Sequence, residues 1–253
     1  NVVGWPDREP TGIFGAYTDI ASPFYLLSML VAALDYRRRT GKGIYMDLSQ
    51  FEAGTSLLGP AILDYSVNYR VAVRSGNRHQ YAVPHAAFPC KGDDRWIAIG
   101  VFSDTEWQSF CKVLGNPEWA TGPRFNTFLS RKHHEDELED YISKWTANHI
   151  AEEVMTWMQE AGVPAGIVAR IQDLFADQQL KHRQHFRVLE HKVIGPHAYN
   201  APAYRLSKTP CDITKAAPSI GEDNEYVLRE VLGYSDEEIA DMLISGAVTT
   251  EEQ

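Results

Sequence analysis

The sequence predicts a globular protein of the mixed α/β class, and two observations support this: the first concerns the class and the second the size of the core. Segments whose apolar residues recur at helical spacing alternate with short segments in which apolar and polar residues alternate one by one. The chain of 253 residues is 44% hydrophobic, enough for a sizeable core in one large or two small domains. No repeat of about 20 to 50 residues is present. We therefore expect a globular chain with helices and strands in mixed order.

A long helix is expected over residues 19–39, where Pro23 is tolerated in the first turn. Asp19 stands at the start of this helix, after Gly12 and Gly15. One interpretation makes Asp19 the helix N-cap, since aspartate is favoured there and its charge suits the positive end of the helix dipole. The other makes it a nucleophile, since a carboxylate at a helix N-terminus stays ionised and small neighbours let an acyl group approach. Local sequence leaves both interpretations open.

Further elements follow in chain order. Alternation predicts a strand over residues 44–49, and Gly59-Pro60 should break a helix over 51–69. Ser103 and Glu106 form a capping box at the start of another helix. The remaining expected elements are a hairpin of 86–90 and 95–100 with its turn at 91–94, helices over 130–148 and 151–161, an extended segment over 162–169, a long polar helix, strands over 187–193 and 202–207, and closing helices over 222–233 and 235–245.

Composition and charge narrow the possible partners and surroundings. The net charge is −10, with 24 basic against 34 acidic residues and no long basic stretch, so we expect no nucleic-acid partner. No apolar run approaches about 18 residues without a charge, glycine or proline, and no signal peptide is visible, so we expect no membrane association. Cys90, Cys111 and Cys211 are widely spaced and odd in number, which indicates free thiols, no structural zinc and a cytoplasmic location.

Six segments in this order resemble the class III coenzyme A-transferases, a family that includes formyl-CoA:oxalate and carnitine-pathway CoA-transferases. The resemblance covers essentially the whole chain. Members of the family carry further sequence ahead of this point, and "NVVGWPDREP" reads as a loop, so we expect the chain to be the C-terminal portion of such a protein. The segments are "GWPDREPTGIFGAYTD", "AALDYRRRTGKGIYMDLSQFEA", "SGNRHQYAVPHAAFPCKGDDRWIAIGVFSDTEWQSFCKVLG", "PRFNTFLSR", "EAGVPAGIV" and "APSIGEDNEYVLREVLG".

The resemblance implies a fold and a reaction. Residues 1–75 would be part of a doubly wound, Rossmann-like CoA-binding domain, 76–170 a smaller α+β domain, and 171–253 a return segment that completes the large domain. Asp19 occupies the place of the family's nucleophile. It would attack an acyl-CoA thioester and form an aspartyl-CoA intermediate that a free carboxylic acid then resolves. The family also implies an interlocked homodimer, with CoA as a substrate and no permanently bound cofactor.

Other candidate site residues carry a functional and a structural interpretation. Gly76, Asn77, Arg78 and His79 occupy the place of a mobile glycine-rich segment that covers the active site in some family members, or form a plain linker. His85 follows them and either faces the site or is structural.

Arg38 and Lys42 are candidates for binding CoA phosphates, although basic residues also suit the last turn of a helix for the dipole alone. No set of residues with metal-ligand spacing is apparent.

Two alternative functions remain. The family fold also serves 2-methylacyl-CoA racemases, which tend to have a glutamate where this sequence has Ser103. A noncatalytic partner domain is the second alternative, and the presence of Asp19 disfavours it.

Overall fold

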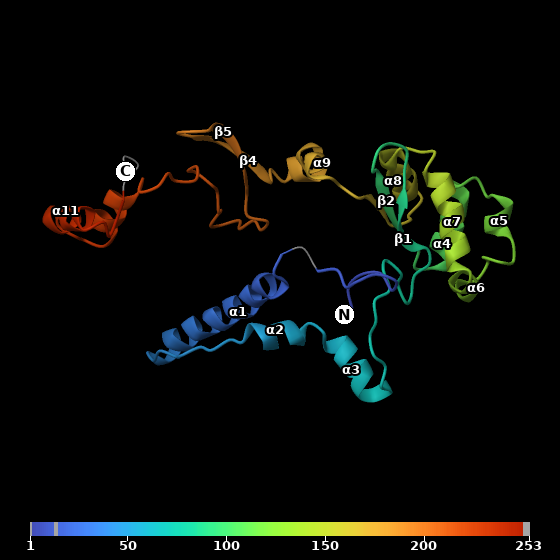
Figure 1. Cartoon of the computed structure of the whole chain (residues 1–253), viewed down its shortest axis with the longest axis horizontal. Helices are drawn as coiled ribbons and strands as arrows, with labels where there is room; N and C mark the ends of the chain where they lie inside the picture. Colours follow the sequence, from blue (N-terminus) through green and yellow to red (C-terminus); the bar gives the residue numbers. More distant parts are fainter. Residues whose placement is uncertain (1, 13–14, 250–253) are drawn as a thin grey trace. The chain divides into compact units, whose positions relative to one another are not determined.

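The computed structural model describes residues 2–12 and 15–249 (Figure 1). The chain divides into two compact units, Asn1–Val168 and Ala169–Gln253. Both helices and strands are present, which confirms the mixed α/β class. The finer division at residues 75/76 and 170/171 stays a prediction.

The first helix, α1 (Tyr17–Thr40), confirms the expected long helix. Ala16, with an extended backbone and no capping side chain, takes the N-cap position. The N-cap interpretation of Asp19 is therefore wrong. Asp19 lies in the first turn instead, where its charge still suits the positive end of the helix dipole. The helix ends because Gly41 adopts the left-handed conformation, at φ 71°, and its N–H donates to the carbonyl of Arg37 at 2.8 Å.

Two short helices follow, α2 (Gln50–Ser56) and α3 (Gly59–Asn68). They confirm the expected break before Gly59-Pro60. The strand expected over residues 44–49 is absent. Alternation alone cannot make a strand without a neighbouring ladder, and no strand of the described residues pairs with this segment. Tyr45 is accordingly 89% exposed.

Few side chains of α1 are covered within the described residues. Ala21 and Ser22 are buried, and α1 contacts α2, whereas Phe24 is 71% exposed. Among the described residues, α1 is also the helix that is long and apolar enough to cross a membrane by length and composition. Core helices of soluble proteins have the same properties, so the expected lack of membrane association stays a prediction.

A three-stranded antiparallel sheet forms the centre of the first unit. Its strands are β1 (His85–Pro89), β2 (Trp96–Gly100) and β3 (Ala165–Ile167), in the order β1-β2-β3. The predicted hairpin and the predicted extended segment over 162–169 are thus confirmed. All strand pairs of the described residues are antiparallel, whereas a doubly wound domain has a mostly parallel sheet, so that part of the expectation stays a prediction from the family resemblance.

One face of this sheet is covered by helices (Figure 1). Phe88, Ile97 and Ile99 point into the main core, which lies between the sheet and the helices. Successive side chains of a strand point to opposite faces. Their neighbours Ala87, Ala98 and Gly100 therefore line the other face. The helices of this part are α4 (Asp104–Val113), α5 (Glu118–Thr121), α6 (Phe128–His133), α7 (Glu135–Thr146) and α8 (Ala151–Glu160).

Two expectations about these helices need correction. The single helix expected over 130–148 is divided at His134 into α6 and α7. Ser103 does cap α4 by accepting the N–H of Glu106 at 3.2 Å. The Glu106 carboxylate, however, bonds the N–H of Phe102 at 2.7 Å, so the capping box is shifted by one residue on that side.

The second unit contains short elements. A hairpin of β4 (Phe186–His191) and β5 (Gly195–Asn200) is its sheet. The strand expected over 202–207 is absent, because β5 pairs with β4 in its place. The long polar helix is divided at Asp177, which caps its second half. The helices are α9 (Ile171–Ala176), α10 (Gln178–His182), the π-helix η1 (Tyr226–Val231) and α11 (Asp236–Ile244).

Candidate active site

Asp19 is exposed in the first turn of α1, and its carboxylate has a defined partner. The Nε2 atom of Gln50 donates a hydrogen bond of 3.0 Å to Asp19 Oδ1. Gln50 is the first residue of α2, which begins there because the Ser49 side chain accepts the N–H of Glu52. A carboxylate that keeps one oxygen hydrogen-bonded and the other open to solvent can be aimed at an electrophile.

Close packing of α2 on α1 places Gln50 within reach of Asp19. Gly54 is buried one turn further along α2, and a Cβ there would lie 2.8 Å from Cγ2 of Thr18. A glycine at this position therefore permits the approach of the two helices. Ser22, one turn after Asp19, is also buried.

The predicted site-bordering residues Gly76, Asn77, Arg78 and His79 lie in a loop held by polar contacts. Gly76 has φ +60°, and its N–H donates to the carbonyl of Gly4 at 2.9 Å. An added Cβ there would meet the ring of Trp5. The glycine is thus required by backbone conformation and by close packing.

Ion pairs fasten the other end of this loop to α6 and α7. Arg78 pairs with Asp136 and, at 3.3 Å, with Glu139. The hydrogen bond with Asp136 is the main cause that raises the pKa of Arg78. Lys132 Nζ donates to the carbonyl oxygen of His79 at 2.8 Å. These contacts fix the backbone that carries Asn77 and His79.

The two predicted histidines come together. The rings of His79 and His85 lie 5.0 Å apart, and each makes an edge contact with Phe102 at 5.7 and 5.8 Å. The Nδ1 atom of His85 lies 2.5 Å from the carbonyl oxygen of Asn77. The loop and the start of β1 therefore form one cluster.

This cluster borders a cavity of about 680 Å³ on the face of the sheet that the helices leave open. Ala87, Ala98 and Gly166 lie side by side across the three strands and form its floor. Asn77 and His85 are part of the lining, so the structure brings two predicted residues to one cavity. The cavity is lined by Asn77, His85, Ala86, Ala87, Ala98, Ile99, Gly100, Phe102, Pro164, Ala165, Gly166 and Val168.

The two residues predicted to bind CoA phosphates lie at the far end of α1. Arg38 is exposed and donates to Asp35 Oδ1 at 3.0 Å, an exposed pair within the helix. Lys42 follows the helix terminus at Gly41. Both lie at the C-terminal end of the helix, where basic residues are also favourable for the helix dipole. Their geometry therefore does not distinguish binding of CoA phosphates from this structural role.

The two buried cysteines, Cys90 and Cys111, offer poor alternative nucleophiles, whereas Cys211 is exposed in the second unit. All three are free, which confirms the expectation from their spacing. Cys90 and Cys111 are buried, and burial raises the pKa of Cys111 to about 11. A thiol of this kind is protonated at neutral pH and is unreactive. Among the described residues, no group of His, Cys, Asp and Glu could hold a metal ion.

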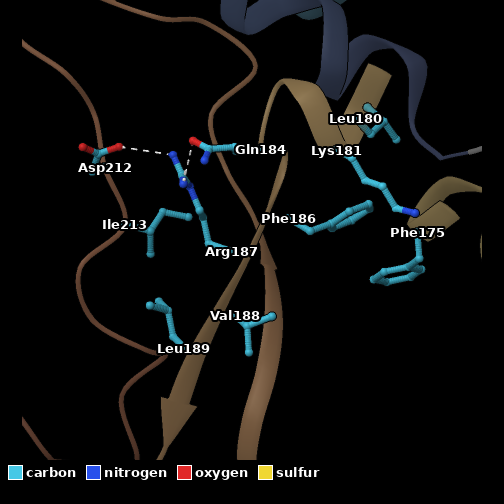
Figure 2. Close-up of a pocket in the computed structure, with 10 residues that line it drawn as sticks. All are labelled: Phe175, Leu180, Lys181, Gln184, Phe186, Arg187, Val188, Leu189, Asp212 and Ile213. Atoms are coloured by element: carbon cyan, nitrogen blue, oxygen red, sulfur yellow. Dashed lines mark hydrogen bonds and ion pairs between the residues drawn. The ribbon is translucent and has the colours of Figure 1, made fainter. Parts of the chain in front are cut away.

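The second unit contains a larger cavity, of about 870 Å³, which includes none of the predicted site residues (Figure 2). The guanidinium of Arg187 lies between Gln184 and Asp212, at 3.1 and 3.6 Å. Phe175 and Phe186 stack at 4.3 Å near the same cavity. Since the arginine is already engaged, this cavity offers a weaker case for an active site than the Asp19 and His85 regions.

Comparison with known proteins identifies the family of this chain. Residues 1–224 match the family model described as CoA-transferase family III. The chain belongs to this family. The relative from Chloroflexus aurantiacus, a succinyl-CoA–D-citramalate CoA-transferase, is 32% identical over 240 residues, which cover 94% of this chain and 59% of the relative. Human succinyl-CoA:glutarate CoA-transferase is 27% identical over 252 residues, covering 100% of this chain and 57% of the relative.

Solved structures agree with this family III assignment. A CAIB/BAIF family protein from Brucella suis superposes with a TM-score of 0.79 at 25% identity, over 91% of this chain and 59% of that one. The chain spans less than two thirds of the length of these relatives. The named relatives are CoA-transferases, so the racemase alternative is not favoured.

Sequence reasoning missed Gln50 and the residues around His85. Gln50 carried no signal of its own, although it stands directly after the Ser49 cap of α2. The cavity floor did have a sequence signal, because small residues alternate with Ile97 and Ile99 along β2. Phe102 could not be placed, because its contact with both histidines depends on the return of the chain after β2.

Proposed function

We propose that this protein transfers coenzyme A from succinyl-CoA to a second dicarboxylic acid through a covalent intermediate on Asp19. Membership of CoA-transferase family III supports transfer of CoA as the reaction type. The Chloroflexus and human relatives are both named for succinyl-CoA as one substrate and for a dicarboxylic acid as the other. The observation that carries the proposal is the exposed Asp19 carboxylate in the first turn of α1, hydrogen-bonded on one oxygen by Gln50.

The reaction proceeds in four acyl-transfer steps. Asp19 attacks the thioester carbonyl of succinyl-CoA, and CoA leaves as a thiolate while a mixed anhydride forms. The thiolate attacks the aspartyl carbonyl of the anhydride, which releases succinate and leaves an aspartyl-CoA thioester. The acceptor carboxylate attacks this thioester and again expels the thiolate. The thiolate then attacks the acyl carbonyl of the acceptor, which gives the new acyl-CoA and restores the Asp19 carboxylate.

Gln50 has a distinct role in this scheme. Its amide orients Asp19 by donating to Oδ1 and leaves the second oxygen free to attack. When the carboxylate becomes an anhydride or a thioester, Oδ1 becomes the carbonyl oxygen, and the same N–H group keeps its hydrogen bond to it. A donor held in place before the reaction stabilises negative charge that develops on that oxygen.

The assembly and location of the protein are also proposals. We place the active enzyme in the cytoplasm as a homodimer. The relatives are longer than the segment that this chain matches, and we propose that activity also needs a region equivalent to their unmatched segment. The exposed apolar side chains of α1, including Phe24 at 71% and Leu27 at 59%, support the burial of this helix in a larger assembly.

A two-substrate assay tests the proposal. Residues 1–253, and any longer protein that contains them, are incubated with succinyl-CoA and a panel of dicarboxylic acids, and each new acyl-CoA is measured. Ping-pong kinetics and loss of turnover in Asp19→Ala are expected. Racemisation of a 2-methylacyl-CoA without CoA exchange, or full turnover in Asp19→Ala, would contradict it. A lack of turnover in every preparation would favour the noncatalytic partner domain.

A further inference from the structure

A further cavity of the first unit lies where three helices end. It has a volume of about 680 Å³, and none of its lining residues belongs to the cavity beside the sheet. Val113, Trp145 and Glu160 line it, and they stand in the last turns of α4, α7 and α8. The C-terminal end of a helix carries a partial negative charge, which favours a cation nearby. The three helix ends therefore contribute a negative potential to this cavity.

Three aromatic rings of the lining contact one another. The ring centroids of Trp145 and Trp157 lie 6.3 Å apart, and the His149 ring lies 4.5 and 5.3 Å from them. Trp157 is 38% exposed, so part of its indole is open to a ligand. The face of an aromatic ring is negative, and tryptophan attracts a cation more strongly than any other side chain of this kind. The rings therefore act in the same direction as the helix ends.

Glu160 adds a full negative charge. It is the only carboxylate of the lining, no Lys or Arg accompanies it there, and within the described residues no basic side chain forms an ion pair with it. The lysines in the last turns of α4 and α7 lie elsewhere. Lys112 lines a different cavity, and Lys144 Nζ stands 5.8 Å from the centroid of the Tyr141 ring. The ligand that complements this cavity is therefore a cation.

The apolar part of the lining determines which kind of cation fits. A primary ammonium is strongly hydrated and brings three N–H donors that need acceptors. Val113, Leu114 and Ala161 offer it none from their side chains. A quaternary ammonium has no N–H group, and its methyl groups suit both apolar walls and ring faces.

We propose that this cavity binds the quaternary ammonium group of a small organic cation. The indoles of Trp145 and Trp157 contact its methyl groups, and Glu160 balances its charge. This binding does not depend on CoA transfer.

A matched pair of ligands tests this assignment by binding to residues 1–253. Choline and 3,3-dimethyl-1-butanol have the same shape, but the alcohol has a carbon atom in place of the charged nitrogen. Titration is followed by NMR of the tryptophan indole N–H groups at about pH 8, above the range in which free histidine titrates. Choline should bind about five- to tenfold more tightly than the alcohol, the effect of a cation–π contact. The resonances of Trp145 and Trp157 should shift, and those of Trp5 and Trp107 should not.

Variants separate the contributions of the rings and of the carboxylate. Trp157→Leu should abolish the preference for choline, and Trp157→Phe, which keeps a ring, should preserve part of it. Glu160→Gln should weaken the binding of choline and leave that of the alcohol unchanged. Glu118→Gln, at an exposed carboxylate of α5 outside the lining, is the matched control and should bind choline like the native protein.

Three results would overturn the assignment. They are equal affinity for choline and the alcohol, no binding of choline, and tighter binding of N-acetyl-lysine amide, a primary ammonium, than of choline. Shifts confined to tryptophans other than Trp145 and Trp157 would place the cation elsewhere and would also contradict it. Because the titrations contain no CoA, their outcome is separate from that of the proposed function.

Discussion

Gln50 Nε2 donates a 3.0 Å hydrogen bond to Asp19 Oδ1 and joins the first turn of α1 to the first residue of α2. The two residues are 31 positions apart in the sequence, so only the packing of the helices brings them together. Within the part of the chain that the structure describes, this pair fixes one oxygen of the carboxylate and leaves the other without a hydrogen bond. Its contribution to transfer can be measured directly.

Replacing Gln50 by alanine should lower kcat about ten- to a hundredfold. A hydrogen bond to a charged group is worth about 1.5–3 kcal/mol, and its loss also leaves the aspartyl oxygen without its donor. Steady-state kinetics with succinyl-CoA give the value. Gln179→Ala, at an exposed glutamine of α10, is the matched control and should leave kcat unchanged. A folded Gln50→Ala variant with full activity would remove this role.

The close approach of α1 and α2 at Gly54 should reverse the usual effect of a glycine-to-alanine substitution on the stability of a helix. Alanine in a helix is ordinarily about 1 kcal/mol more stable than glycine. Gly54→Ala should instead lower the melting temperature, because its Cβ would lie 2.8 Å from Cγ2 of Thr18. Combination with Thr18→Ser removes that methyl group and should restore stability and activity. If Gly54→Ala alone stabilises the protein, the helices do not pack in this way.

Protonation of Glu222 at acid pH should lower the stability of the second unit. The hydrogen bond with Lys192 and the N–H of Ser219 lower the pKa of Glu222 to about 2, against an ordinary value of 4.5. A lowered pKa in the folded state stabilises the protein above about pH 4.5, and this stabilisation is lost as the pH falls towards 2.

Hydrogen exchange of residues 219–224 between pH 5 and pH 2.5 measures this effect. Protection in the native protein should decrease over this range, and Glu222→Gln should show low protection throughout. Glu230→Gln on η1 is the control and should follow the native protein. Identical profiles for the native protein and Glu222→Gln would show that the Lys192 pair contributes nothing.

Sequence patterns predicted the elements that depend on local signals. The hairpin with its turn at 91–94, the helix start at Ser103 and the break before Gly59 rest on turn, capping and proline chemistry, and all are found. The expected strand over 44–49 failed because pairing depends on a distant partner. The sequence did not indicate roles for Gln50 and Phe102 for the same reason, because these roles arise from contacts between segments far apart in the sequence.

Trapping the covalent intermediate tests the central claim most directly. The protein that supports transfer is incubated with succinyl-CoA, treated with hydroxylamine, digested and mapped by mass spectrometry. Hydroxylamine attacks the activated aspartyl carbonyl and leaves a hydroxamate on the nucleophile. The label should appear on Asp19, depend on succinyl-CoA and be absent from Asp19→Asn. A label on another residue, or continued turnover in Asp19→Asn, would contradict the assignment of Asp19 as the nucleophile.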